Sequence, residues 1–127
     1  MSKTIIYTAK APEPIGPYSQ AILVGNTLYV SGQIAIEPST GKLHSLTIEK
    51  ETQQVMMNMR AILDAAGMNF SHVVKCSIFL SDMKNFPLVN TVYGECFPEN
   101  PPARETVEVS KLPKDANVEI SCIAVKE

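Results

Sequence analysis

The strand-like segments of this sequence divide their side chains unevenly between two faces. Runs at 27–31, 73–80, 103–109 and 118–125 predict strands, in which successive side chains point to opposite sides. One side is almost entirely apolar: Leu28, Val30, Val74, Cys76, Ile78, Leu80, Val107, Val109, Val118, Ile120, Cys122 and Ala124. The other side is mixed: Thr27, Tyr29, Ser31, Lys75, Ser77, Phe79, Arg104, Thr106, Glu108, Glu119, Ser121, Ile123 and Val125. The pattern predicts a sheet with one face that must be covered.

Two amphipathic segments supply the cover for that apolar face. Apolar or compact residues recur every three or four positions from Thr47 to Ala66, which predicts a helix that Gly67 ends. A second helix is predicted from Asn85 to Phe97, with Asn85 as its cap and Pro87 accommodated in the first turn. A sheet with helices on one face only is an α+β arrangement.

The N-terminal part of the chain adds two strands and an irregular loop. Thr4–Tyr7 is extended and apolar, and the runs 20–24 and 27–31 flank a Gly-Asn turn, which predicts a hairpin. The segment between these strands carries three prolines, so it must lie on the surface or across a cleft. A chain of 127 residues buries one core, and residues 1–127 are expected to form a single domain.

The mixed face of the predicted sheet has two interpretations. It is too apolar to be fully exposed to water and too polar for a closed core, so it can be buried against other subunits. Antiparallel sheets also tolerate one partly solvated face without any partner. Of the two, we favour burial between subunits.

Composition argues against several classes of function. Eleven Lys and Arg against thirteen Asp and Glu give a formal charge of -2, so no basic surface is expected and nucleic-acid binding is disfavoured. The three cysteines are odd in number and lack C-x-x-C spacing, which predicts free thiols in a reducing, cytoplasmic compartment. No apolar run reaches the ~18 residues of a membrane span, and the opening segment does not have the layout of a secretory signal.

No motif for a metal ion or a nucleotide cofactor is present. His44 and His72 each lack a second ligand at metal spacing, and no glycine-rich phosphate-binding pattern occurs. Cys76 and Cys122 fall on the predicted apolar face, where a thiol is inert. Ser31 has no histidine at a spacing that predicts a partner, so a binding role is favoured over a nucleophilic one. We therefore expect neither a metal nor a cofactor.

Alternation places Arg104 and Glu119 on the same mixed face. A cross-strand ion pair, which contributes about 0 to 1 kcal/mol, explains such a pair without any function, and spacing alone favours it. The functional alternative is that the planar guanidinium binds a substrate carboxylate through two parallel hydrogen bonds. A nearby glutamate then serves as general base on water.

Five segments together resemble one known family, in order and over nearly the whole chain. They are IGPYSQA (15–21), YVSGQI (29–34), VNTVYGECF (89–97), PPARETVEV (101–109) and LPKDANVEI (112–120). These segments are similar to those of the RidA family, also called YjgF/YER057c/UK114. The resemblance implies a chorismate-mutase-like α+β fold, with a six-stranded mixed sheet backed by two helices. It also implies a homotrimer with three clefts between its subunits.

The activity that the resemblance implies is cofactor-free hydrolytic deamination of reactive enamines and imines. The substrates would be 2-aminoacrylate and 2-aminocrotonate or their tautomers 2-iminopropanoate and 2-iminobutanoate, released by dehydratases acting on serine and threonine. The products would be ammonia and a 2-oxo acid. A protonated imine is already electrophilic, so the protein need only orient its carboxylate and present one water.

The resemblance also implies roles for individual residues. Arg104 would bind the substrate carboxylate and Glu119 would hold and activate the attacking water. Gly32 would offer its carbonyl to the imine nitrogen, and Thr106, which replaces a cysteine of many relatives, its backbone amide to the carboxylate. The positions implied to line the cleft are Tyr18, Ser31, Gly32, Asn90 and Thr106.

Two positions depart from the family pattern. Glu105 follows the motif arginine where relatives usually carry a small residue, and alternation places it on the apolar face near a strand end. Ser121 stands where many deaminating members have a second acidic residue. Two other functions therefore stay open: endoribonuclease or translation-inhibitor activity, which some relatives are named for, and non-catalytic binding of a small carboxylate by a trimer.

Overall fold

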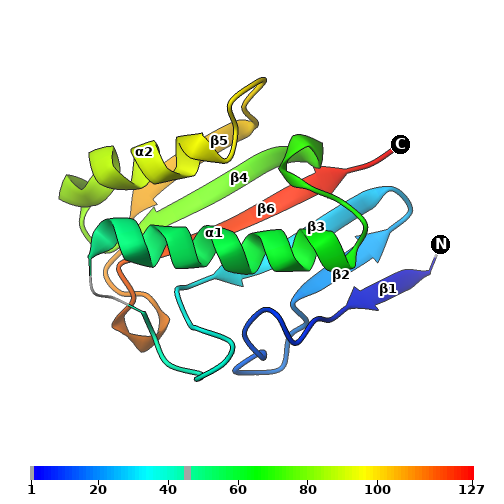
Figure 1. Cartoon of the computed structure of the whole chain (residues 1–127), viewed down its shortest axis with the longest axis horizontal. Coiled ribbons are helices and arrows are strands. Elements are labelled where there is room, and N and C mark those ends of the chain that lie inside the picture. The colour runs from blue at the N-terminus through cyan, green and yellow to red at the C-terminus, as the bar shows by residue number, and fades with distance from the viewer. Residues whose placement is uncertain (1, 45–46) are drawn as a thin grey trace.

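One mixed sheet and two helices form the two layers of the molecule, which is seen here in a computed structural model (Figure 1). Within residues 2–44 and 47–127, which the structure describes, the sheet has six strands in the order β1-β2-β3-β6-β4-β5. β4 and β5 are parallel, and every other neighbouring pair is antiparallel. The strands are β1 Lys3–Ile6, β2 Ala21–Val24, β3 Thr27–Gln33, β4 Val73–Leu80, β5 Ala103–Glu108 and β6 Val118–Val125. This confirms the predicted α+β architecture.

The two helices are α1, Ile48–Ala65, and α2, Phe86–Glu95. The hydroxyl of Thr47 accepts a hydrogen bond from Lys50 N at 3.1 Å and caps α1. Gly67 follows its end with a φ of 72°, a backbone conformation that glycine adopts without a steric penalty. α2 begins after Asn85, whose side chain makes no cap hydrogen bond, so the predicted capping role was wrong. Three short 3-10 helices complete the structure: η1 Phe70–His72, η2 Met83–Asn85 and η3 Pro113–Asp115.

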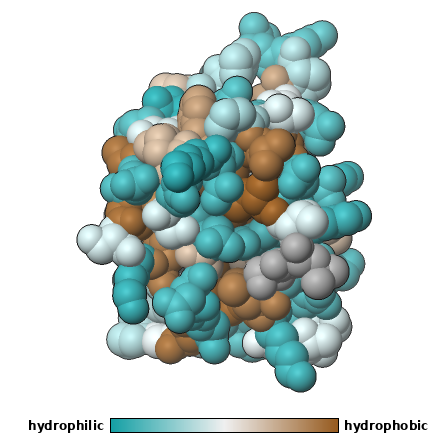
Figure 2. Space-filling view, turned by 90° about the vertical axis from the view of Figure 1, so that its left-hand side faces the viewer, coloured by the Kyte–Doolittle hydropathy of each residue, from teal (hydrophilic) through white to brown (hydrophobic). Residues whose placement is uncertain are grey.

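The core lies between the helices and the sheet. α1 contributes a fully buried stripe that packs on the inward-facing side chains of the central strands. Each such aliphatic side chain contributes about 1.5 to 3 kcal/mol by leaving water. The largest of them are Leu28, Val55, Met59, Ile62, Leu63, Ile78, Leu80, Val89, Val118 and Ile120. On the side of the molecule at which both helices begin, hydrophobic groups form separate patches among hydrophilic ones (Figure 2).

The predicted face assignment was wrong for β5. Its register pairs Arg104 with Cys76 and Thr106 with Ile78, and directly paired residues share a face of the sheet. Cys76 and Ile78 are buried beneath the helices, so Arg104 and Thr106 lie on the helix-covered face. Glu105, predicted on that face, instead lies on the open one.

The reason for the reversal is that β5 is an edge strand with no clear apolar alternation. Its sequence, ARETVE, has polar residues on both faces, and its Val107 is exposed on the open face. Glu108, predicted with Arg104, follows it to the helix-covered face because it pairs with Leu80. Packing of the arginine against α2 decides the register, and the strand sequence alone does not encode that contact.

β4 departs from the prediction at its first residues. The pairing of β4 with β6 shifts between Val73 and Lys75, which indicates a bulge. Val73 is therefore the inward-facing residue, at 6% exposed, and Val74 is 47% exposed instead of buried as predicted. From Cys76 onwards the predicted alternation is confirmed.

Asn58 is a polar residue on the buried side of α1 that the helical pattern did not predict. Its Nδ2 donates to Ile34 O at 3.1 Å and to Ile36 O at 2.9 Å, while its Oδ1 accepts from Gln54 at 2.9 Å. The residue is buried. It therefore ties the irregular chain after β3 to the middle of α1.

We expect Asn58→Ala to lower the free energy of unfolding by roughly 2 to 4 kcal/mol, because two buried carbonyls lose their donor. Urea unfolding followed by circular dichroism measures this change. The matched control is Gln53→Ala, an exposed amide on the same helix, which should change stability by less than about 0.5 kcal/mol. Equal effects of the two variants would contradict this account of Asn58.

Candidate active site

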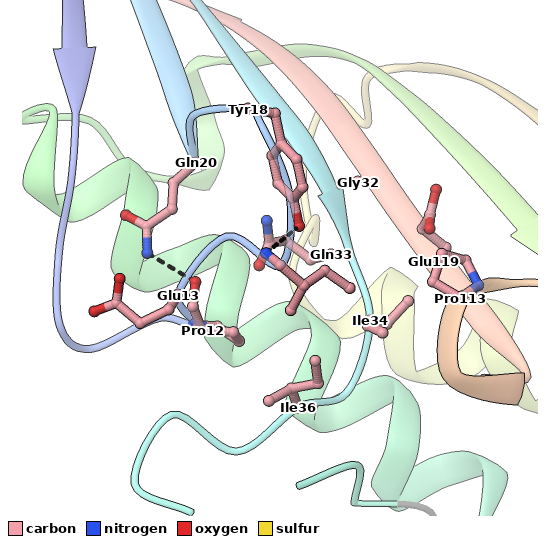
Figure 3. Close-up of a pocket in the computed structure, with 11 residues that line it drawn as sticks. Pro12, Glu13, Tyr18, Gln20, Gly32, Gln33, Ile34, Ile36, Pro113 and Glu119 are labelled. Carbon is pink, nitrogen blue, oxygen red and sulfur yellow. Dashed lines mark hydrogen bonds between the residues drawn. The ribbon is translucent and has the colours of Figure 1, made fainter. Parts of the chain in front are cut away.

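A hollow lies at the end of the sheet where β3 ends and β6 begins (Figure 3). It encloses about 440 Å³ of empty space, including its opening to solvent. The proline-containing loop before β2 forms one wall, while Glu119 of β6 and Pro113 of η3 form another (Figure 3). The lining residues are Pro12, Glu13, Ile15, Tyr18, Gln20, Gly32, Gln33, Ile34, Ile36, Pro113 and Glu119. A shallower hollow adjoins it and adds Ser31.

Gln20 holds the proline-containing loop in shape from the inside. Its Nε2 donates to Thr8 O at 3.0 Å and to Pro12 O at 2.9 Å, and its Oε1 accepts from Thr8 N at 2.8 Å. Prolines lack an N–H, so such a loop has few hydrogen bonds of its own. Tyr18 adds one more, because its hydroxyl accepts from Ile15 N at 3.2 Å. Sequence reasoning missed Gln20, although a glutamine next to a proline-rich loop was a possible signal.

Glu119 is a half-buried carboxylate whose side chain lies directly over Gly32. Burial raises the pKa of Glu119 above its usual value. A Cβ at position 32 would stand 2.5 Å from Glu119 Oε2 and 2.8 Å from its Cδ. Any side chain at position 32 would therefore have to displace this carboxylate.

Arg104 lies in a second cluster, beneath α2. Its Nη1 donates to Asn90 Oδ1 at 2.8 Å. Its guanidinium carbon lies 5.1 Å from the ring centre of Tyr93 and 5.5 Å from that of Phe86, distances typical of cation–π contacts. Thr106 is the next residue on this face, and its buried hydroxyl has no hydrogen-bond partner among the described residues.

The predicted site residues thus form two groups on one chain. Tyr18, Gly32 and Glu119 meet at the hollow, which Ser31 adjoins. Arg104 and Thr106 lie beneath α2, and Arg104 is hydrogen-bonded to Asn90 of that helix. Glu119 pairs with Phe79 on the open face, so it and Arg104 lie on opposite faces of the sheet.

The structure also rules out the simple ion-pair interpretation of Arg104 and Glu119. Within residues 2–44 and 47–127, the ion pairs are His44 with Glu37 and Lys75 with Glu105. The Lys75 Nζ to Glu105 Oε1 distance is 2.9 Å, and Ser77 donates a hydrogen bond to the same carboxylate. Glu105, one of the two departures from the family pattern, is therefore engaged by its own neighbours on the open face.

The histidines and buried cysteines have structural surroundings. His44 Nδ1 lies 2.6 Å from Glu37 Oε1, and His72 Nδ1 accepts from Asn69 N at 3.0 Å. Cys76 and Cys122 are buried, as predicted, and burial raises the pKa of both thiols. The described residues contain no group of three or more His, Cys, Asp or Glu placed to hold a metal ion. In the same part of the chain, no helix has the length and apolar character needed to cross a membrane.

Comparison with known proteins identifies the family. The sequence model named Endoribonuclease L-PSP matches residues 8–126. A RutC family protein of Pyrococcus abyssi is 50% identical over 127 residues, covering 100% of both chains. The human 2-iminobutanoate/2-iminopropanoate deaminase is 46% identical over 124 residues, covering 98% of this chain and 90% of its own. The chain belongs to the Endoribonuclease L-PSP family, which includes the RidA proteins.

A solved structure of the RidA family confirms the fold. The crystal structure of E. coli TdcF with bound serine matches with a TM-score of 0.93 at 35% identity, covering 98% of this chain and 99% of that one. The six-stranded mixed sheet with two helices on one face is therefore the RidA-family fold. Family members carry both deaminase and endoribonuclease names.

We expect Gly32→Ala to displace the Glu119 side chain, because the added methyl group would overlap its carboxylate. Because the overlap is with the movable end of a half-buried side chain, the free energy of unfolding should fall by no more than about 1 kcal/mol. A crystal structure of the variant shows the displacement and urea unfolding measures the loss.

The matched control is Gly94→Ala in α2, where a Cβ would meet nothing within 4 Å. It should stabilise the protein by roughly 0.5 to 1 kcal/mol through helix propensity. An unmoved Glu119 in Gly32→Ala would show that the glycine is not needed for the carboxylate.

Proposed function

We propose that this protein hydrolyses small 2-imino acids, namely 2-iminopropanoate and 2-iminobutanoate or their enamine tautomers, to 2-oxo acids and ammonia without a cofactor. The reaction takes place in clefts between the subunits of a homotrimer. Each cleft combines the Arg104 group of one copy with the Glu119 group of another. The observation that carries this proposal is the separation of two complementary half-sites on opposite faces of one chain.

Each half-site lacks what the other supplies. The guanidinium of Arg104 is held in place by Asn90 and two aromatic rings but has no carboxylate partner among the described residues. Glu119 is half-buried and has no cation partner in the same part of the chain. An anionic substrate between two copies would satisfy the arginine and bring its reactive carbon to the glutamate.

The open face of the sheet supports assembly with other copies. Tyr29 and Val107 are exposed on it, and Phe79, Ile123 and Val125 are only partly covered. Apolar side chains grouped on one face favour a protein partner. Closure of three copies into a ring would bring an edge of one sheet to the open face of the next, which is a heterologous contact.

The chemistry follows from these groups. Arg104 binds the carboxylate of the protonated imine through parallel hydrogen bonds. Glu119 accepts a proton from a water whose oxygen bonds to the imine carbon, and the C=N electron pair moves to nitrogen, giving a carbinolamine. Glu119 then passes this proton to that nitrogen. As the C–N bond breaks, the hydroxyl oxygen forms the C=O bond and gives its proton to Glu119, so that ammonia and the 2-oxo acid leave and the last proton is released to solvent. The relative TdcF holds serine, an amino acid with the same carboxylate.

We expect the wild-type protein to accelerate loss of the imine produced by a serine or threonine dehydratase. Arg104→Ala should lower kcat/KM by at least about 100-fold, because two charge-assisted hydrogen bonds are lost. Glu119→Gln should lower kcat by about 10² to 10⁴ through loss of the base. The matched control is Arg60→Ala, an exposed arginine on α1, which should retain full activity. An active Arg104→Ala protein with intact assembly would contradict the proposal.

Mixing the two inactive variants separates a shared cleft from a site within one chain. When Arg104→Ala and Glu119→Gln chains are unfolded together and reassembled in equal amounts, about one quarter of the clefts in a ring combine an intact arginine with an intact glutamate. Activity should return to about that fraction of the wild-type value. No recovery from well-assembled mixed trimers would show that the two groups do not share a cleft.

A parallel assay on unstructured RNA tests the endoribonuclease alternative, which the net charge of -2 disfavours.

The pH dependence should reflect the environment of Glu119. Because burial raises the pKa of Glu119 and a base must be deprotonated, kcat/KM should fall on the acidic side at a pH above the ordinary glutamate pKa of about 4.3.

The raised pKa of Glu119 also makes the stability of the fold depend on pH. Protonated Glu119 favours the folded state at low pH, and this contribution is lost as the pH rises through the pKa of Glu119 in the folded protein. Glu119→Gln should therefore unfold at a higher temperature than wild type at pH 7, with a difference that shrinks near pH 4. A wild-type acidic limb at or below pH 4 would contradict the role of burial.

A further inference from the structure

Glu51 is the one charged side chain that is fully buried within the described residues, at 0% exposed. It belongs to the first turn of α1, on the helix-covered side of the sheet. None of the ion pairs in the described chain includes it. A buried carboxylate needs compensating hydrogen bonds, so its contacts show what it does.

Three N–H groups at the entry to β6, two from Asn117 and one from Val118, donate to Glu51. Its Oε2 accepts from Asn117 N at 2.7 Å and from Val118 N at 3.3 Å, and its Oε1 accepts from Asn117 Nδ2 at 2.8 Å. All three partners are donors, so an acceptor-only carboxylate suits this position better than an amide. The contact joins residues that are 66 and 67 positions apart in the chain.

Asn117 is also held by the residue that follows the neighbouring strand β4. Ser81 N donates to Asn117 O at 3.1 Å, and Ser81 Oγ donates to Asn117 Oδ1 at 3.3 Å. Asn117 is therefore fixed between α1 and the end of β4. The residue two positions later is Glu119.

The segment that enters β6 would not hold this shape by itself. Lys114 and Asp115 have φ values of 56° and 55°, a left-handed conformation that non-glycine residues adopt at a steric cost. Pro113, in the same turn, lines the hollow with Glu119. An anchor at Asn117 and Val118 fixes the chain between Pro113 and Glu119, the two residues that form this wall of the hollow.

We infer that Glu51 is a positioning residue that sets the Glu119 and Pro113 wall of the cleft by anchoring Asn117, which precedes β6, and Val118, the first residue of β6. This inference rests on the proposed function, because it concerns the placement of the proposed base. Loss of the anchor should let the left-handed turn relax and move Glu119 away from the attacking water.

The primary test is Glu51→Gln, which keeps the shape of the side chain but turns one end into a donor that faces the donors of β6. We expect kcat for imine hydrolysis to fall roughly 10- to 100-fold, as for a small misplacement of a catalytic group, with KM changed less than about twofold, because Arg104 is untouched. Hydrogen exchange should speed up at the amides of residues 117–119 but not in β5. The matched control is Glu49→Gln, an exposed carboxylate in the same turn, which should change neither quantity.

Rescue by a second substitution separates positioning from general destabilisation. Asn117→Asp alone places two carboxylates together and should be at least as damaging as Glu51→Gln. In the double variant Glu51→Gln, Asn117→Asp, the new amide can donate to the new carboxylate, and its oxygen can still accept from the backbone. We expect kcat and the protection of residues 117–119 to recover by at least tenfold relative to Glu51→Gln.

Two results would overturn the inference. One is a folded Glu51→Gln protein with wild-type kcat and wild-type exchange at residues 117–119, even if it melts at a lower temperature. The other is a double variant with no recovery of either quantity. If Glu51→Gln does not assemble, Asn117→Ala leaves the two backbone bonds to Glu51 and removes the side-chain bonds to Glu51 and Ser81. It is judged by the same two measurements. A wild-type protein inactive on every imine would refute the proposed function, while the exchange data would still decide whether Glu51 anchors this wall.

Discussion

The register of β5 against β4 determines how the proposed site is divided. Because Arg104 pairs with Cys76, its side chain lies under α2, where Asn90 and two aromatic rings hold it. A shift by one residue would move Arg104 to the open face with Glu119 and leave the charged Glu105 against the core. The observed register instead places the two groups on opposite faces of one chain, and the proposal of a cleft shared between copies is based on this separation.

Buried polar side chains shape the hollow where regular structure ends. Gln20 satisfies the carbonyls of the proline-containing loop, Asn58 those after β3, and Glu51 the amides before β6. A surface site on irregular segments needs such anchors, because loops lack the repeating hydrogen bonds of helices and strands. The three together hold the walls on either side of Glu119. The core of the molecule and the geometry of its hollow are thus linked through specific hydrogen bonds rather than through apolar packing alone.

The sequence pattern predicted the positions of the helices and strands well. It predicted which side chains are buried less well. β4 and β6 have the predicted bounds, because their alternation is strong and clearly terminated. The β5 faces were reversed, because ARETVE has no apolar face of its own and its orientation depends on contacts with α2. The β4 bulge has no local signal in a run of two valines. Glu51 resembled an ordinary solvated residue, because its partners lie more than 60 positions away. The site residues came from the family resemblance, and spacing alone had favoured a surface ion pair that the structure does not contain.

The features that define the hollow are also those that disfavour folding. Burial raises the pKa of Glu119 and disfavours its ionised form, and no ion pair within the described residues includes it. Gly32 leaves out a side chain so that this carboxylate can lie against the backbone, and the turn before β6 contains two left-handed non-glycine residues. Each is destabilising in isolation, and each persists because well-bonded neighbours enforce it. Concentration of such groups around one carboxylate is typical of sites prepared for chemistry. The clustering of unfavourable features around Glu119, beside a sheet that is otherwise conventionally packed, supports the proposed catalytic role of this carboxylate.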